Sequence, residues 1–276
     1  MKNPLIRSIS GIVFIVLMIL GLTVDKFLFA ALFLFIMCMM LSEFYHITMG
    51  DKYKVSRGLA IGAGAILFIL LFLVSAYGIP GRYVALALVP VLIVMSNSLY
   101  AKDKSGFDLF SHIYTGLLYI AVPLGLSNLI AFDHGVFDGR LLLCFFIIIW
   151  SSDVGAYCAG LTLGKKFPKK LFEEISPKKT WAGFFGGLVC AVIASVILGV
   201  VGMFRFPLVH CAVLAVVMHI AGVYGDLFES QWKRCHDIKD SGSVIPGHGG
   251  MMDRFDSAFF TLPTALLLAI IANNLF

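Results

Sequence analysis

Charged residues are scarce in this sequence. Lys, Arg, Asp and Glu together make up 13% of the 276 residues, whereas 60% are hydrophobic and the mean hydropathy is +0.96. A soluble domain usually contains about 25% charged residues, so this composition excludes an ordinary soluble globular protein. It also argues against a nucleic-acid partner, because the chain has no basic soluble module that could neutralise a phosphate backbone.

Paired cysteine motifs are also lacking, and so are internal repeats. No two of the six cysteines have the spacing of a zinc site or a disulfide framework, and five lie in apolar runs, where cysteine is typical of a small hydrophobic residue. No low-complexity tract or long linker interrupts the chain. We therefore predict a single membrane unit without a structural metal site of the Cys and His type.

Long apolar runs recur along the whole chain and predict an all-α polytopic integral membrane protein. A helix rises about 1.5 Å per residue, so about 20 apolar residues cross a hydrocarbon core of about 30 Å. The first run follows Lys2 and Arg7 as a signal peptide would, but without a small-residue cleavage site we interpret it as a membrane helix. We count nine runs: Ile6–Val24, Phe27–Phe44, Leu59–Ile79, Tyr83–Leu99, Ile113–Phe132, Leu141–Leu163, Trp181–Phe204, Pro207–Phe228 and Phe255–Asn274.

The Lys and Arg residues predict the orientation of these helices, because short cytoplasmic loops hold an excess of cations. With the N-terminus in the cytoplasm, nine spans leave the C-terminus outside. Of the 21 cations, only four then lie on the outer side: Lys26, Arg82, Arg140 and Arg205. The remaining 17 lie on the cytoplasmic side, where anionic headgroups and nucleotides are the natural partners.

Acidic residues near or within the apolar runs divide the chain into two parts. We predict a helical scaffold over residues 1–135 and a catalytic region over residues 136–276, with its site facing the cytoplasm. Asp153 lies within the sixth run, where facing lipid would cost about 2.5–3.5 kcal/mol. We therefore expect it to face a polar interior near substrate or metal; a structural Asp that bonds Ser151 or Ser152 is the alternative.

Two pairs of carboxylates lie near the cytoplasmic boundary. Asp226 and Glu229 end the eighth run, and Asp253 and Asp256 begin the ninth, each pair with the i, i+3 spacing of one helix face. Carboxylates that meet need a cation between them, and oxygen ligands without His or Cys favour Mg²⁺. Asp226, Asp253 and Asp256 are therefore the predicted metal ligands. A solvated helix end and capping of the ninth helix are the alternatives.

Two further segments suggest phosphate binding. A glycine-rich turn at residues 246–250 precedes the ninth helix, where backbone N–H groups and the helix end favour an anion; a plain tight loop is the alternative. Residues 175–183 enter the seventh helix, which Ser176 or Thr180 would cap, with Pro177 in its first turn. The lysines of this segment are expected at the depth of the lipid headgroups. The alternative is that they are only part of the ordinary excess of cations on the cytoplasmic side. The cations concerned are Lys178, Lys179, Lys233, Arg234, Lys239 and Arg254.

These motifs resemble the signature of the phosphatidate cytidylyltransferases, also called CDP-diglyceride synthases. The resemblance covers about residues 150–265 by motif and the rest only by hydrophobic pattern. Two positions depart from it: Trp232 stands where the family has an aliphatic residue or Phe, and Ala182 where an acidic or amide residue is frequent. The matching positions are Asp153, Ala156, Tyr157, Ser176, Pro177, Lys179, Thr180, Asp226, Ser230, Lys233, Arg234, Lys239, Asp240, His248, Gly249, Gly250, Asp253, Arg254 and Asp256.

The resemblance implies that CTP and phosphatidate react to CDP-diacylglycerol and pyrophosphate in an Mg²⁺-dependent nucleotidyl transfer. It leaves a second cation open and implies a homodimer in the bacterial inner membrane, with the active site facing the cytosol. Asp226, Lys233, Asp253 and Asp256 are the implied catalytic residues. The implied substrate-binding residues are Asp153, Ser176, Lys178, Lys179, Thr180, Ser230, Arg234, Lys239, His248, Gly249, Gly250 and Arg254.

Two other functions compete with this one. A cytidylyltransferase acting on another lipid phosphate would carry the same motifs, and only parallel assays of lipid phosphates separate the two. A transporter for cations or nucleotides could also place acids inside helices, but it would be expected to show repeated or inverted halves, and the sequence has none.

Overall fold

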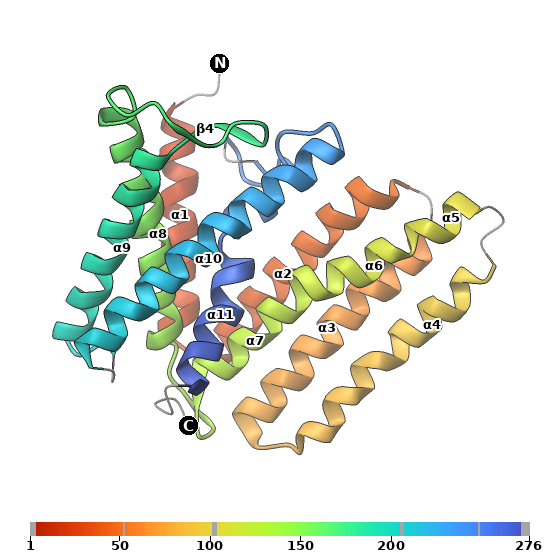
Figure 1. Cartoon of the computed structure of the whole chain (residues 1–276). Helices are drawn as coiled ribbons and strands as arrows, with labels where there is room; N and C mark the ends of the chain where they lie inside the picture. Colours follow the sequence, from red (N-terminus) through yellow and green to blue (C-terminus); the bar gives the residue numbers. More distant parts are fainter. Residues whose placement is uncertain (1–3, 52, 101–103, 205–206, 248, 272–276) are drawn as a thin grey trace. The chain divides into compact units, whose positions relative to one another are not determined.

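The computed structural model describes residues 4–51, 53–100, 104–204, 207–247 and 249–271, and most of them are helical (Figure 1). The chain forms two compact units. Unit 1 comprises Met1–Asp138 and Asp240–Phe255, and unit 2 comprises Gly139–Lys239 and Asp256–Phe276. The loop that contains the glycine-rich turn therefore belongs to unit 1, while the residues on both sides of it belong to unit 2. Whether a scaffold and a catalytic region divide at about residue 135 stays a prediction.

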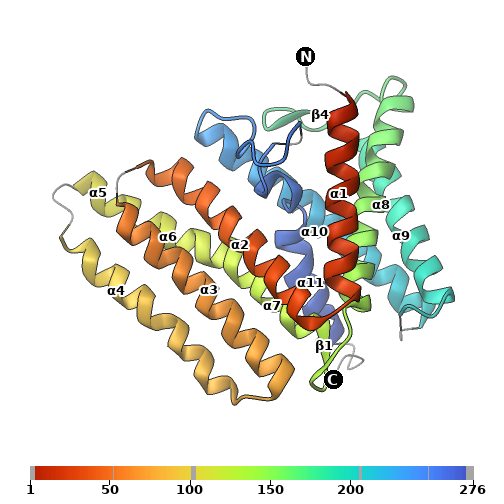
Figure 2. The ribbon, with the colours of Figure 1, turned by 180° about the vertical axis from the view of Figure 1, so that it is seen from behind.

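Unit 1 is a group of long apolar helices around a core of Phe side chains. Helix α3 packs against α2, α4 and α7, and α1 packs against α2 (Figures 1 and 2). The rings of Phe29 and Phe33 lie 4.8 Å apart between centroids, and Phe29 also contacts Phe68 and Phe132. The elements are α1 (Pro4–Thr23), α2 (Lys26–Met49), α3 (Lys54–Tyr77), η1 (Gly81–Ala87), α4 (Leu88–Ser98), α5 (Lys104–Leu109), α6 (Ser111–Gly116), η2 (Leu117–Ala121), α7 (Val122–Ala131), β1 (Phe132–Asp133), β2 (Val136–Phe137) and η3 (Met252–Arg254).

The described residues of unit 2 form four helices and one hairpin. Helix α9 packs against α8 and α10, and α11 packs against α10 and α8 (Figure 1). The hairpin pairs Lys170 with Thr180 and Phe172 with Ser176 in antiparallel register, and it leads directly into α9. The elements are α8 (Arg140–Thr162), β3 (Lys170–Phe172), β4 (Ser176–Thr180), α9 (Trp181–Val200), α10 (Leu208–Cys235) and α11 (Ala258–Ile271).

The helices are typical of a multi-pass membrane protein. In the part of the chain that the structure describes, seven helical segments are long and apolar enough to cross a membrane, and two shorter apolar helices, Ser8–Thr23 and Ala258–Ile271, coincide with the first and ninth predicted runs. The count of nine and the orientation stay predictions. The seven segments are Lys26–Met49, Lys54–Tyr77, Gly81–Ser98, Phe107–Ala131, Arg140–Thr162, Trp181–Val200 and Leu208–Cys235.

The predicted helix ends near the site are partly wrong. Thr180 does cap α9, since its hydroxyl accepts a hydrogen bond from the Gly183 N–H at 3.1 Å. Ser176 and Pro177, however, lie in strand β4, because hairpin pairing replaces the expected first helical turn. Helix α11 begins only at Ala258, so Asp253 and Asp256 precede the helix rather than occupying its first turn.

Glycines let α8 and α9 approach closely. A Cβ on Gly155 would lie 2.6 Å from the Cβ of Cys190, and a Cβ on Gly186 would lie 2.1 Å from that of Ala159. Both distances are far below van der Waals contact, so any side chain at either position forces the helices apart. Residues of α8 and of the start of α9 both line one cavity.

We expect Gly186→Ala to lower the midpoint of thermal unfolding in detergent. Overpacking typically costs about 1–3 kcal/mol, which outweighs the gain of at most about 1 kcal/mol in helix propensity. Gly62→Ala in α3 is the matched control, because a Cβ there meets nothing within 4 Å. We expect the control to be neutral or slightly stabilising. If Gly186→Ala unfolds at or above the midpoint of the control, the close approach of α8 and α9 is wrong.

Candidate functional site

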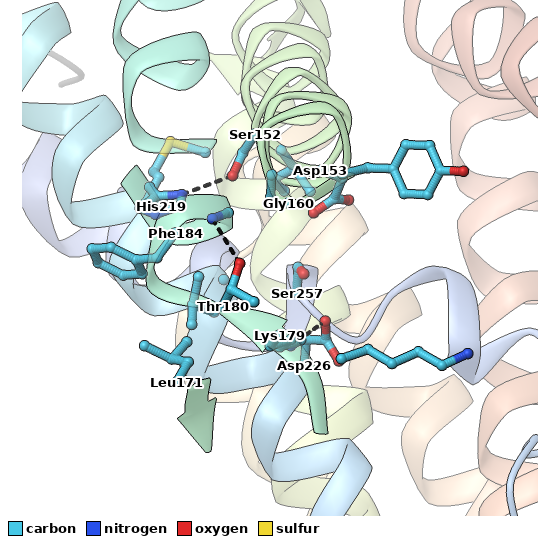
Figure 3. Close-up of a pocket in the computed structure, with 18 of the residues that line it drawn as sticks. Ser152, Asp153, Gly160, Leu171, Lys179, Thr180, Phe184, His219, Asp226 and Ser257 are labelled. Atoms are coloured by element: carbon cyan, nitrogen blue, oxygen red, sulfur yellow. Dashed lines mark hydrogen bonds and ion pairs between the residues drawn. The ribbon is translucent and has the colours of Figure 1, made fainter. Parts of the chain in front are cut away.

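Unit 2 contains a cavity of about 460 Å³ between its helices and the hairpin (Figure 3). Apolar residues of α8, α9 and α10, such as Ile149, Phe184 and Met218, form much of its wall. Polar residues of its wall come from four elements or their flanks, α8, β4, α10 and α11: Ser152, Asp153, Lys178, Lys179, Thr180, His219, Asp226, Ser257 and Thr261. An apolar cavity with a few convergent polar groups is the usual form of a binding site for small molecules.

Lys179 and Asp226 form the central ion pair of this cavity (Figure 3). The Lys179 Nζ lies 2.5 Å from Asp226 Oδ2, and the two side chains are 26% and 33% exposed. On the other oxygen, Asp226 Oδ1 accepts a hydrogen bond from the Ser230 hydroxyl at 3.3 Å, one turn further along α10. Lys179 of strand β4 therefore pairs with a carboxylate of helix α10, a contact that the sequence analysis did not predict.

Asp256 adds a further carboxylate to the same unit. Burial raises its pKa well above the usual value, and the negative charges of Asp226, Glu229 and Asp153 raise it further, against a lowering hydrogen bond from the Ser257 N–H. The charges of three acids from α8 and α10 therefore act on Asp256. Such a group is stabilised by any cation that enters it.

Glu229 and Lys233 form a second ion pair on α10. Their side chains lie one turn apart, with 3.2 Å between Lys233 Nζ and Glu229 Oε1, and they are 0% and 12% exposed. Lys233 was predicted to clamp a phosphoryl oxygen, and that role stays a prediction. The buried pair places its ammonium along the same helix as Asp226 and Ser230.

Asp253 lies in unit 1 and holds the loop there. Its Oδ2 accepts hydrogen bonds from the N–H groups of Ser241 and Gly250, at 2.9 and 2.8 Å, and the Ser241 hydroxyl lies 3.1 Å away. A Cβ on Gly249 would lie 2.6 Å from the same oxygen, and Gly249 has a φ of +89°. The Gly250 N–H predicted to bind phosphate thus serves Asp253. The role of Asp253 as a metal ligand stays a prediction.

The remaining predicted residues lie in varied surroundings. Arg234 is exposed, and its guanidinium donates to the Ile238 carbonyl at 3.0 Å. Lys239 and Arg254 are exposed, Lys178 is exposed at the rim of the cavity, and Ser176 is half-buried in β4. His248 lies outside the described residues.

Comparison with known proteins identifies the family of this chain. The model of the cytidylyltransferase family matches residues 5–272. The chain belongs to the cytidylyltransferase family. The phosphatidate cytidylyltransferase of Bacillus subtilis is 37% identical over 182 residues, which cover 64% of this chain and 65% of that protein. The one of Rickettsia bellii is 32% identical over 219 residues, covering 77% and 90%.

A third relative has the same extent as the first. The phosphatidate cytidylyltransferase of Staphylococcus saprophyticus is 33% identical over 178 residues, which cover 64% of this chain and 66% of that protein. This cytidylyltransferase family member therefore spans slightly less than two thirds of the length of the Bacillus and Staphylococcus relatives that it matches.

The carboxylates of this cytidylyltransferase family member fit Mg²⁺ only together with substrate phosphates. Among the described residues, no three His, Cys, Asp or Glu side chains are close enough together to hold a metal ion. Mg²⁺, however, is usually bound by one or two carboxylates together with substrate phosphates. Asp226 already binds the ammonium of Lys179, and Asp256 responds to the charge of Asp226. These two are thus the donors that fit a magnesium nucleotide.

Two polar residues of this cytidylyltransferase family member were missed from the sequence. His219 is 2% exposed; its Nδ1 lies 2.8 Å from the Ser152 hydroxyl, and its ring packs on Phe184, so it links α10 to α8 and α9. Glu43, in α2, accepts hydrogen bonds from the Asp240–Phe255 loop. A single His or Glu in an apolar run gives no sign of its partner, because that partner is distant in the sequence.

Proposed function

We propose that this chain transfers a cytidylyl group from CTP to phosphatidate and so forms CDP-diacylglycerol and pyrophosphate. The observation that carries the proposal is the cavity of unit 2, in which Lys179 is bound to Asp226. Asp256 directly precedes Ser257, which lines the same cavity. Family membership and the printed names of the relatives support the substrates. Family membership also argues against the transporter alternative.

The reaction forms one P–O bond and breaks another. An oxygen of the lipid phosphate attacks the α-phosphorus of CTP, and the bond from that phosphorus to the bridging oxygen of the β-phosphate breaks, so pyrophosphate leaves with the electron pair. The attacking phosphate is already anionic and needs little general-base assistance. Positioning and charge stabilisation therefore provide most of the rate enhancement, as in phosphoryl transfer in general.

The proposal assigns roles to Lys178, Lys179 and Asp226, which line the cavity, and to three charged residues that do not line it. Asp226 and Asp256 would hold Mg²⁺, which neutralises the charge that develops on pyrophosphate; a second cation remains open. Lys179 exchanges its carboxylate partner for a phosphate oxygen when substrate enters, and Lys178 binds the phosphatidate headgroup at the rim. Lys233 and Arg254 contact further phosphoryl oxygens.

We further propose nine membrane helices with a cytoplasmic N-terminus and an outer C-terminus, in the bacterial inner membrane. The distribution of Lys and Arg supports this orientation, and the two shorter apolar helices supply the additional spans. The site then faces the cytosol, the source of CTP, at the depth of the lipid phosphate. The family resemblance also supports a homodimer.

The test of this function is pyrophosphate release by the purified protein in detergent. We expect release from CTP to require both phosphatidate and Mg²⁺, and CDP-diacylglycerol to form in equal amount. Parallel reactions with a prenyl phosphate instead of phosphatidate separate the closest alternative. Release of pyrophosphate that does not depend on lipid would contradict the proposal, and faster turnover of the prenyl phosphate would replace its lipid substrate.

A further inference from the structure

Glu43 is a buried acid in a helix with no motif of the family. It lies in α2 and is 9% exposed. Its Oε1 accepts a hydrogen bond from the Met251 N–H at 2.9 Å, and its Oε2 accepts from the Met252 N–H at 3.0 Å and from the Ser241 hydroxyl at 3.1 Å. Glu43 therefore contacts residues near both ends of the loop Asp240–Phe255, which contains the glycine-rich turn. All of these groups belong to unit 1.

The loop is shaped around this carboxylate. A Cβ on Gly242 would lie 2.8 Å from Glu43 Oε1, and a Cβ on Gly250 would lie 2.6 Å from Glu43 Oε2 and 2.1 Å from the Ser241 hydroxyl oxygen. All three distances are too short for a real Cβ atom. Two glycines of the loop are thus required for the approach of Glu43, which gives them a function besides contact with phosphate.

Glu43 and Asp253 together act as the anions of the loop. Backbone N–H groups that converge on one point bind an anion, and here the carboxylates of the protein occupy that position. The N–H groups of Ser241 and Gly250 donate to Asp253, whereas those of Met251 and Met252 donate to Glu43. The Ser241 hydroxyl lies 3.1 Å from both acids and has one proton, so it donates to one of them at a time.

The end of the loop is fixed as well. Phe255 is 0% exposed, and its ring packs edge-on against Phe14 with 5.9 Å between centroids. Asp256 follows Phe255 directly in the chain. The backbone just before this proposed metal ligand is therefore fixed at three residues. Met252 donates its N–H to Glu43, Asp253 accepts the N–H of Gly250, and the ring of Phe255 is buried.

We infer that Glu43 is a positioning residue for the proposed cytidylyl transfer, acting through the loop that leads to Asp256. The inference rests on the proposed function. Among the described residues, Glu43 accepts hydrogen bonds from uncharged donors of the loop, and these bonds hold Ser241, Met251 and Met252. Loss of this carboxylate displaces the loop and with it Asp256, without removing any group that contacts substrate.

Glu43→Gln is the most direct test, because the amide has the shape of the carboxylate. The NH₂ group of the glutamine would face the N–H of either Met251 or Met252. Two donors would then face each other, and one of the hydrogen bonds that hold the loop would be replaced by repulsion. Tyr45→Phe is the matched control: Tyr45 is also buried in α2, and its hydroxyl donates to the Ile113 carbonyl at 2.9 Å rather than to the loop. Both variants lose a buried hydrogen bond of unit 1.

We expect Glu43→Gln to lower kcat about 10–100-fold, the effect of a small displacement of reacting groups, and to raise the Mg²⁺ concentration that gives half the maximal rate. Hydrogen exchange in peptides covering residues 241–252 should become faster. Tyr45→Phe should leave all three measurements unchanged even if it lowers the thermal unfolding midpoint as much. This difference separates positioning from a general loss of stability.

Three results would overturn the inference. Unchanged hydrogen exchange in the peptides covering residues 241–252 of Glu43→Gln would show that the hydrogen bonds to Glu43 do not hold the loop. Faster exchange with unchanged kcat and Mg²⁺ requirement would show an anchor without influence on the site, and an equal response of Tyr45→Phe would show a nonspecific effect. If Glu43→Gln does not accumulate, the same measurements are made on Ser241→Ala, which removes the hydroxyl that lies 3.1 Å from both Glu43 and Asp253 but keeps the backbone N–H bonds to both acids; smaller changes in the same directions are expected.

Failure of the proposed function is distinguishable from failure of this inference. If the unaltered protein releases no pyrophosphate from CTP and phosphatidate, the proposed function falls. The rise in thermal unfolding midpoint on adding CTP with Mg²⁺ then replaces kcat as the measurement, because a ligand that binds the folded state raises its stability. A rise in the unaltered protein and in Tyr45→Phe, but a smaller rise in Glu43→Gln, supports positioning; equal rises contradict it.

Discussion

Replacing Asp256 by Asn is expected to abolish turnover while the protein still folds. The change keeps the side-chain shape but removes the carboxyl group, so the side chain can no longer become a carboxylate when a cation binds beside it. Charge stabilisation by a bound metal ion provides several kcal/mol, and each 1.36 kcal/mol corresponds to tenfold in rate. We therefore expect a loss of at least about 10³-fold in pyrophosphate release, with a raised Mg²⁺ requirement for any residual activity.

Asp237→Asn is the matched control for this experiment. Asp237 is exposed two residues beyond the end of α10 and has a φ of +54°, a conformation that Asn also accommodates. The control makes the same substitution in unit 2 without altering the cavity. We expect it to retain nearly full activity. Asp256→Asn with more than about a tenth of the normal rate would remove this carboxylate from the proposed metal site.

Replacing Lys179 by Met is expected to cause the second largest loss. The substitution keeps most of the apolar side chain but removes the ammonium that lies 2.5 Å from Asp226 Oδ2. Loss of one charge-stabilising group typically costs about 10²–10³ in kcat, and we expect a loss of this size. Because the ammonium no longer competes for Asp226, the half-saturating Mg²⁺ concentration should fall, in contrast to its rise in Asp256→Asn.

Lys170→Met tests whether charge alone accounts for that result. Lys170 is exposed in β3 of the same hairpin and does not line the cavity. We expect Lys170→Met to change the rate less than twofold, which corresponds to less than about 0.5 kcal/mol in activation free energy. A loss in Lys170→Met equal to that in Lys179→Met would attribute both to general attraction of anions, and a raised Mg²⁺ requirement in Lys179→Met would contradict the exchange of partners proposed for Asp226.

Much of the fold follows from hydrophobic periodicity and length. The apolar runs coincide with helices throughout the described residues, because a chain in lipid must satisfy its backbone groups within each segment. The spacing of Asp226 and Ser230 on one helix face was also predictable, and so was the cap at Thr180. These are local properties, which depend on residues less than two turns apart.

Other features depend on partners that the local sequence does not reveal. The SPKKT segment, with Pro177 and two lysines, was read as a helix start but pairs with Lys170 and Phe172 in a hairpin. Gly249 and Gly250 were read as a phosphate loop, yet the side chains that meet their backbone are Asp253 and Glu43. The glycine pattern indicated a close approach correctly, but it could not identify which anion approaches.

The separation of Glu43 from its partners has a consequence for biosynthesis. Glu43 and Met251 are 208 residues apart in the chain, so the loop cannot take its shape until a ribosome has made nearly the whole protein. Contacts of such separation form late and slowly. A fragment of residues 150–265 would contain every motif residue but not Glu43, and it would therefore lack the hydrogen bonds that hold Ser241, Met251 and Met252 in the complete chain.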